Sequence, residues 1–206
     1  MRQDTPYSAR PAGERARELE CVRLLLPSVS PAPRLVYEAF GGVGMLTALF
    51  AWAWSEATLV ATELDADCAS SPRPEGALVR ERDCLEYMRS QSLGPDEALF
   101  SLDFNQCTLR DLRDPVSFQS QVMTEVRRLQ PRWVQLTDSA VGKLHLNFSR
   151  YGLTSPGLDD YLDLVAINLG WRAVAASAHS AASHVLFDLL SPEGSGWSGR
   201  ATRVRA

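Results

Sequence analysis

One segment carries most of the structural information in this chain: Val36-Tyr37-Glu38-Ala39-Phe40-Gly41-Gly42-Val43-Gly44-Met45-Leu46-Thr47. Its apolar start ends at Glu38, three glycines follow within four positions, and a helix-like pattern begins at Met45. This order predicts a strand, a tight turn and a helix N-terminus, which is how doubly wound α/β folds bind nucleotide-like ligands. Glycine has no Cβ atom, so the backbone can turn sharply and a ligand can lie against it.

The next predicted strand also ends in an acid. Residues 57–62 are apolar and β-branched, as expected of a buried parallel strand, and Glu63 follows them. Glu63 lies 19 positions after Gly44 (63 − 44 = 19). A carboxylate about 20 residues after the glycine turn binds a ribose diol in this architecture. We therefore expect Glu63 to bind a ribose.

Two further predicted strands, 78–83 and 98–105, carry an acid near their ends. In an open α/β sheet the ligand lies beyond the carboxyl ends of the strands, and these ends share one edge. The sequence therefore predicts one cleft lined with carboxylates. The four acids expected there are Glu38, Glu63, Asp83 and Asp103.

The sequence of the last third of the chain predicts an antiparallel strand pair, unlike the parallel strands before it. Residues 132–137 indicate a fifth strand, and 171–177 and 184–190 indicate two more, joined by six residues. So short a connection requires an antiparallel pair, since a parallel return needs a dozen or more residues. The predicted fold class is therefore α/β: a doubly wound, mostly parallel seven-stranded sheet with a C-terminal antiparallel hairpin and helices on both faces.

The ends of the chain differ from its centre in composition. Residues 1–12 are polar and contain two prolines, so we expect a disordered N-terminus. Residues 13–190 are expected to form a single Rossmann-like domain. Residues 191–206 are rich in glycine and serine, which is typical of a flexible tail.

Composition argues against a membrane-spanning protein, a secreted protein and a metal site. No apolar run reaches the ~18 residues that span a membrane, and the N-terminus has no secretory signal. The four cysteines show neither metal nor redox spacing, so we expect no metal site, reduced thiols and a cytoplasmic location. A net charge of −4 argues against a broad basic surface for nucleic acid. Small groups of arginines could still form local basic patches: Arg110, Arg113, Arg127, Arg128, Arg132, Arg200, Arg203 and Arg205.

Four short motifs follow one another along the chain: Glu38-x-Phe40-Gly41-Gly42-x-Gly44, Glu63-Leu64-Asp65, Arg82-Asp83-Cys84 and Leu102-Asp103-Phe104-Asn105. With these motifs, residues 34–190 resemble the class I S-adenosylmethionine-dependent methyltransferases. The resemblance implies a Rossmann-like fold and S-adenosyl-L-methionine as the cofactor. A nicotinamide cofactor fits less well, because Thr47 stands in place of the third glycine of Gly-x-Gly-x-x-Gly.

The resemblance also implies roles for single residues. The backbone at Gly42 and Gly44 would pass the methionine part of the cofactor, Asp83 would bind the adenine amino group, and Cys84 would flank the adenine edge. Phe40 stands where the family more often has glycine, although the cytosine-C5 branch also has phenylalanine there. The expected cofactor-binding residues are Glu38, Phe40, Gly41, Gly42, Gly44, Glu63, Leu64, Asp83, Cys84 and Asp103.

The expected catalytic residues are Asp103 and Asn105, at the end of the fourth predicted strand. Methyl transfer is a displacement in which the protein mainly aligns the reacting atoms. A neutral amine or hydroxyl acceptor must also lose a proton, which Asp103 could accept while Asn105 orients the acceptor. The alternative is that Asp103 only caps the following turn and contacts the cofactor.

The methyl acceptor is less well defined by the sequence. Nucleic-acid amino methyltransferases have an Asn/Asp-Pro-Pro-aromatic turn where this chain has Asp103-Phe104-Asn105, and Cys107 lacks the proline that precedes the cytosine-C5 nucleophile. Residues 137–145 distantly resemble the Asp-x-Ala segment of tRNA guanosine-N2 methyltransferases. We predict a methyltransferase with a nucleic-acid base as acceptor. A small-molecule acceptor and a catalytically inert, cofactor-binding partner subunit remain alternatives.

Overall fold

The computed structural model describes residues 12–92, 97–104, 114–138, 158–179, 182–191, 193–197, 199 and 201–204. The segment predicted to be disordered, 1–12, lies outside these residues except for Ala12, where the first helix begins. Asn105, Cys107 and residues 139–152 also lie outside them. What the sequence predicts for those residues therefore stays a prediction.

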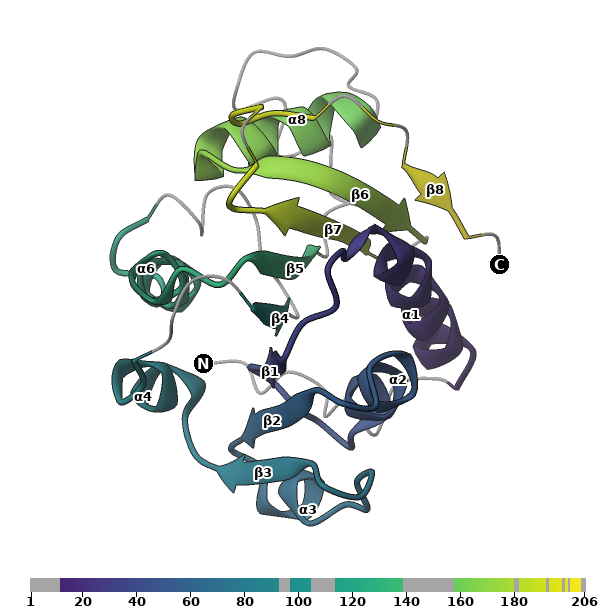
Figure 1. Cartoon of the computed structure of the whole chain (residues 1–206), viewed down its shortest axis with the longest axis vertical. Coiled ribbons are helices and arrows are strands. Elements are labelled where there is room, and N and C mark those ends of the chain that lie inside the picture. Colours follow the sequence, from purple (N-terminus) through teal and green to yellow (C-terminus); the bar gives the residue numbers. More distant parts are fainter. Residues whose placement is uncertain are drawn as a thin grey trace.

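The described residues form one eight-stranded sheet in the order β3-β2-β1-β4-β5-β7-β6-β8 (Figure 1). The strands β1 to β5 pair in parallel, whereas β7 is antiparallel to both β5 and β6. A mostly parallel sheet that ends in an antiparallel hairpin is thus confirmed. The strands are β1 (Leu35–Glu38), β2 (Thr58–Glu63), β3 (Leu78–Glu81), β4 (Ala98–Asp103), β5 (Trp133–Asp138), β6 (Arg172–Ala178), β7 (Ser183–Asp188) and β8 (Thr202–Arg203).

Helices cover both faces of this sheet, as the doubly wound pattern predicts. Figure 1 shows α1, α2 and α3 on one side of the sheet and α4 and α6 on the other. The helices are α1 (Ala12–Leu25), α2 (Met45–Ala53), α3 (Ala66–Ala69), α4 (Cys84–Arg89), α6 (Phe118–Leu129) and α8 (Leu158–Leu169), with a short 3-10 helix η2 (Leu26–Ser28).

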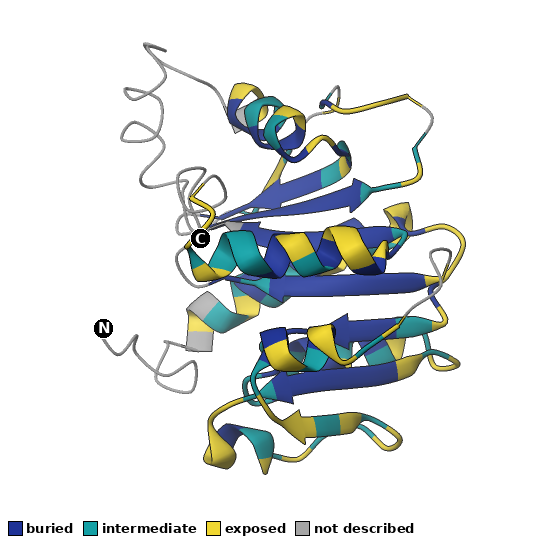
Figure 2. Ribbon diagram, turned by 90° about the vertical axis from the view of Figure 1, so that its left-hand side faces the viewer, coloured by how far each residue is buried: buried dark blue, intermediate teal, exposed yellow. Residues whose placement is uncertain are grey.

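The core consists of two apolar clusters, one on each face of the sheet. Leu99 of β4 packs with Phe50 of α2 in the first cluster, and the next residue, Phe100, packs with Val126 of α6 in the second. Successive side chains of a strand point to opposite faces, which explains this division. The central strands β1, β2, β4, β5 and β7 are accordingly mostly buried, whereas the edge strand β3 is largely exposed (Figure 2). No helix in the described part of the chain is long and apolar enough to cross a membrane.

The eighth strand corrects the predicted number of seven. β8 comes from segment 191–206, for which composition predicts a flexible tail, and it pairs in parallel with β6. The reason lies in contacts with α8. The backbone N–H of Trp197 donates to Asp163 Oδ1 at 2.7 Å, and its indole N–H donates to Asp159 Oδ1 at 3.0 Å. Composition alone cannot reveal such contacts.

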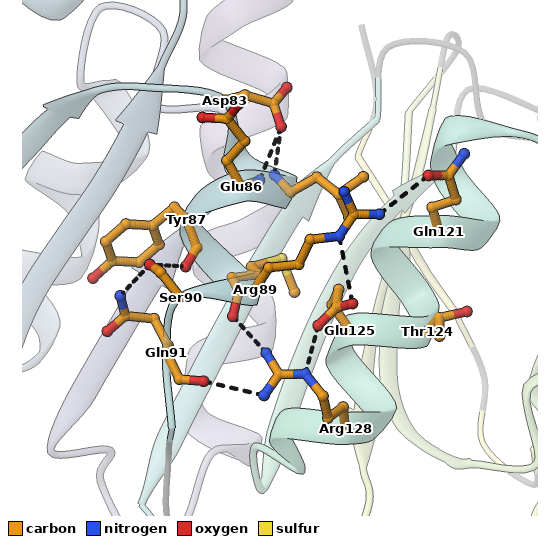
Figure 3. Close-up of polar contacts among 12 residues, drawn as sticks. Asp83, Glu86, Tyr87, Arg89, Ser90, Gln91, Gln121, Thr124, Glu125 and Arg128 are labelled. Carbon is orange, nitrogen blue, oxygen red and sulfur yellow. Dashed lines mark hydrogen bonds and ion pairs between the residues drawn. The ribbon is translucent and has the colours of Figure 1, made fainter.

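A polar network joins α4 to α6 (Figure 3). Arg128 donates from Nη2 to the Met88 carbonyl at 2.6 Å and from Nη1 to the Gln91 carbonyl at 3.1 Å. Arg128 thus binds carbonyls at and just after the end of α4, where the Met88 carbonyl also accepts from the Gln91 N–H at 3.1 Å. Glu125 accepts from Arg128 Nε at 2.6 Å. The network holds α4 in place, and with it Asp83 at the N-terminus of that helix.

Candidate cofactor and active site

The predicted acids gather at one edge of the sheet. Glu38, Glu63 and Asp103 are the last residues of β1, β2 and β4, and β1 pairs in parallel with both other strands. Asp83 follows β3 and is the N-cap of α4. The order of strands reverses at β1, which is where ligands bind in open α/β sheets.

The glycine loop turns sharply between β1 and α2. The Gly41 N–H donates to the Thr62 carbonyl at 2.9 Å, and the Gly44 N–H donates to the Gly41 carbonyl at 2.9 Å. Gly44 caps α2 with a φ of 86°, in the left-handed region that favours glycine. A Cβ atom at this position would also lie 2.6 Å from Cδ of Arg73. The backbone conformation therefore favours glycine at position 44, and a larger residue would also displace the Arg73 side chain.

Glu63 is held by the backbone between the glycine loop and the end of β2. Its Oε2 accepts from the Gly42 N–H at 2.8 Å. Its Oε1 accepts from the N–H groups of Leu64 and Asp65, at 2.8 and 3.0 Å. A carboxylate can accept about four hydrogen bonds, so a ligand hydroxyl can still bind to this fixed carboxylate.

Asp83 and Cys84, which follow β3, lie in different environments. Asp83 Oδ1 accepts from the N–H groups of Leu85 and Glu86, at 2.9 and 3.1 Å, and so caps α4. Cys84, expected to flank the adenine edge, has its side chain buried in the core, and this burial raises the pKa of the thiol to about 12. A contact between Cys84 and a ligand would therefore have to use its main chain. Leu64 is exposed.

Glu38 is the most deeply buried of the four acids, with 4% of its surface exposed. Thr47 of α2 donates from Oγ1 to its Oε2. Burial raises the pKa of Glu38 to about 8, against the opposing effects of the Thr47 hydrogen bond and the Arg73 charge. The carboxyl group is therefore protonated below about pH 8 in the folded protein.

The free energy of unfolding is expected to fall between pH 6 and pH 8, and Glu38→Gln should remove that fall. In this range the unfolded carboxyl is ionised, whereas the folded one is still protonated, so unfolding releases a proton and rising pH favours it. The loss is about 2 kcal/mol over the two units and levels off above pH 8. Urea unfolding of both proteins at pH 6, 7, 8 and 9 measures it. Parallel pH curves for the two proteins would contradict the raised pKa.

One carboxylate oxygen of Asp103 lacks a hydrogen-bond donor within the described residues. Its Oδ1 is buried and forms no hydrogen bond within the described part of the chain, although the residue as a whole is partly exposed. A buried acceptor without a partner is costly, so a donor from a ligand would be favourable there. Asn105, the second expected catalytic residue, lies outside the described residues.

A row of buried polar side chains crosses the sheet beside Asp103. Ser101 Oγ donates to Gln135 Oε1 at 2.6 Å, and Gln135 Nε2 donates to Thr137 Oγ1 at 3.0 Å. Thr137 Oγ1 in turn bonds with His184 Nδ1 at 3.1 Å. Thr137 is also the strand partner of Asp103. No motif in the sequence links these residues; the one signal is a polar residue within each otherwise apolar strand.

Three aromatic rings meet at the same edge. The Phe40 ring lies 5.5 Å from the Phe104 ring and 6.0 Å from the Phe118 ring, between centroids. Phe104 is buried, whereas Phe118 is 38% exposed at the start of α6. Phe40 and Phe104 belong to the motifs found in the sequence, but no local pattern connects Phe118 with them.

Arg73 also belongs to the site, although it lies in none of the four sequence motifs. It lies between α3 and β3, yet its Nη2 donates to the carbonyls of Gly42 and Cys68. Its guanidinium group therefore lies against the glycine loop, about 30 residues earlier in the chain.

The sequence matches no known family model and no curated protein. The fold has relatives among solved structures. Fibrillarin, in a complex with Nop5p, superposes with a TM-score of 0.56 at 10% identity, over 83% of this chain and 81% of that one. PH1948 of Pyrococcus horikoshii, a proposed RNA methyltransferase, superposes with a TM-score of 0.52 at 11% identity, over 88% of this chain and 87% of that one.

A third relative was solved with a ligand. PigF, in a complex with SAH, superposes with a TM-score of 0.52 at 13% identity, over 86% of this chain and 56% of that one. These identities are low, so the likeness concerns the fold. That fold, with its strand order and its antiparallel end, is the fold of the class I S-adenosylmethionine-dependent methyltransferases.

Proposed function

We propose that this chain is an S-adenosylmethionine-dependent methyltransferase that holds its acceptor beside Asp103. The proposal is carried by the buried Asp103 Oδ1, which has no partner within the described residues at the end of the central strand β4. An inert cofactor-binding subunit gains nothing from an unpaired buried carboxylate, which lowers stability. The observation therefore favours an enzyme over the inert alternative.

The residues at the edge of the sheet fit the cofactor. Glu63 would bind the ribose hydroxyls, because its carboxylate is already oriented by three backbone N–H groups. Asp83 would contact the adenine amino group. The methionine part would lie along the backbone at Gly42 and Gly44, beside the Arg73 guanidinium group. Glu38, Phe40, Gly41, Leu64, the Cys84 main chain and Asp103 complete the proposed set.

The proposed mechanism assigns Asp103 to the acceptor. When bound, the cofactor supplies an electrophilic methyl group on a sulfonium. Asp103 holds the nucleophilic atom of the acceptor by a hydrogen bond and accepts the proton that it loses. Asp103 ends the buried strand β4, which pairs with β1 and β5, and this restricts its movement and favours a fixed reacting geometry. Asn105 is proposed to orient the acceptor.

A nucleic-acid base is the acceptor that we propose. The rings of Phe40, Phe104 and Phe118 lie at the same edge as Asp103, and Phe118 is partly exposed to a ligand. Aromatic side chains stack on any base, at about 1–3 kcal/mol per base. A small planar molecule would use the same rings. Transfer of a labelled methyl group into RNA and DNA oligonucleotides, compared with free nucleosides, separates these acceptors.

The arginines near residue 130 do not support a nucleic-acid surface. Arg127 lies over the ring of Trp171, Arg128 is bonded to α4, and Arg132 lies over the ring of Trp133. Arg132 also precedes β5, at the edge opposite the acids. These three arginines therefore contribute nothing to the proposed nucleic-acid acceptor, whereas Arg110, Arg113, Arg200 and Arg205 lie outside the described residues.

A cytoplasmic location is part of the same proposal. Cys21, Cys68 and Cys84 are free and buried, and burial raises the pKa of Cys21 to about 11. Reduced, unreactive thiols are typical of cytosolic proteins.

Glu63→Ala is expected to weaken binding of S-adenosylhomocysteine by about 1.5–3 kcal/mol, the range for a hydrogen bond to a charged group. Isothermal titration calorimetry measures the loss. Glu56→Ala is the control, since Glu56 is exposed just before β2 begins and should leave affinity unchanged. Equal affinity of Glu63→Ala and wild type would remove Glu63 from the cofactor site.

A further inference from the structure

We infer that Arg73 binds the carboxylate of the cofactor's methionine part, and that it selects ligands with an amino-acid tail over plain nucleosides. The inference rests on the proposed function. Arg73 lies in the connection between α3 and β3, outside every motif that the sequence analysis used.

The guanidinium group lies against the glycine loop. Its Nη2 donates to the Gly42 carbonyl, and also to the Cys68 carbonyl at 3.2 Å. A Cβ atom at Gly41 would lie 3.6 Å from Nη2, and one at Gly44 would lie 2.8 Å from Cζ. The positive charge is thus placed beside the start of α2, the end of a helix that itself favours anions.

Two donors of this guanidinium group are unused. Nε and Nη1 are buried and have no hydrogen-bond partner within the described residues. An arginine is always charged and has only donors, so buried N–H groups without an acceptor are costly. A carboxylate is the acceptor that suits them best, because charge-assisted hydrogen bonds are the strong ones.

Three acids near the glycine loop and α3 already have other partners. Glu38 accepts from Thr47, and Glu63 accepts from three backbone N–H groups. Asp65 accepts from the Cys68 N–H and caps α3. Both described hydrogen bonds of Arg73 go to backbone carbonyls, and within the described residues no acid forms an ion pair with it, so an anion from outside can bind there.

The test compares two ligands on Arg73→Ala. S-adenosylhomocysteine carries the carboxylate, and 5′-methylthioadenosine lacks the whole amino-acid tail. Calorimetry should show S-adenosylhomocysteine bound about 10- to 100-fold more weakly than by wild type, the effect of a lost charge-assisted hydrogen bond, with methylthioadenosine unchanged. Arg73→Lys should recover part of the loss. Arg34→Ala is the control, because Arg34 pairs with Glu97 before β1, away from the acids.

Three results would overturn the inference: unchanged binding of S-adenosylhomocysteine by Arg73→Ala, an equal loss for both ligands, or wild-type affinity in Arg73→Gln. Wild-type protein provides a check that needs no variant. Decarboxylated S-adenosylhomocysteine should bind at least about tenfold more weakly than the intact ligand. If wild type binds neither adenosyl ligand, the proposed function fails, which is a different result from a failure of Arg73.

Discussion

Asp103→Asn is expected to slow methyl transfer by about 10²–10⁴-fold, the usual contribution of general acid–base catalysis. Asparagine keeps the shape of the side chain but cannot accept the proton of the acceptor. The affinity for S-adenosylhomocysteine should change little, because Asp103 is assigned to the acceptor. Single-turnover transfer with the acceptor found by labelling, together with calorimetry on the same variant, measures both quantities.

The outcome separates three roles of Asp103. Loss of cofactor affinity in step with activity would assign the residue to the cofactor pocket. Full activity would mean that positioning alone carries the reaction. Asp67→Asn is the matched control, because Asp67 is an exposed acid on α3, and it should leave turnover unchanged.

Gly44→Ala is expected to weaken S-adenosylhomocysteine binding by about 100-fold and to destabilise the fold. A residue with a Cβ atom pays about 1–2 kcal/mol to adopt the φ of 86° at this position. The new Cβ atom would also lie 2.6 Å from Cδ of Arg73, so the Arg73 side chain would have to shift away from its place beside the loop. The loss of affinity corresponds to a lost charge-assisted hydrogen bond.

Gly76→Ala is a matched control for this variant. Gly76 has a similar φ of 82°, but a Cβ atom there would meet nothing within 4 Å. The free energy of unfolding of Gly76→Ala should fall by about as much as the backbone strain costs in Gly44→Ala. Its affinity for S-adenosylhomocysteine should stay that of wild type. Urea unfolding and calorimetry on both variants separate strain from collision. Wild-type affinity in Gly44→Ala would mean that the loop is only a structural turn.

The sequence predicts the fold because its signals are local. A strand, a glycine turn and a helix occupy twelve consecutive residues around Gly42, and their backbone preferences act over a few positions. The antiparallel end follows from the length of one connection. The position of each acid follows as well, since a residue that ends a parallel strand must lie at the carboxyl edge of the sheet. Whether Glu63 and Asp83 bind cofactor stays a prediction.

Tertiary structure alone decides which side chains from distant segments meet at that edge. Arg73 reaches the loop at Gly42, and Phe118 reaches Phe40, although no sequence period connects either pair. The same holds for Trp197, whose bonds to α8 hold part of the predicted tail beside the sheet. Such contacts depend on how helices pack across a sheet, which is set by the fit of many side chains at once. Local backbone preferences hold no information about that fit.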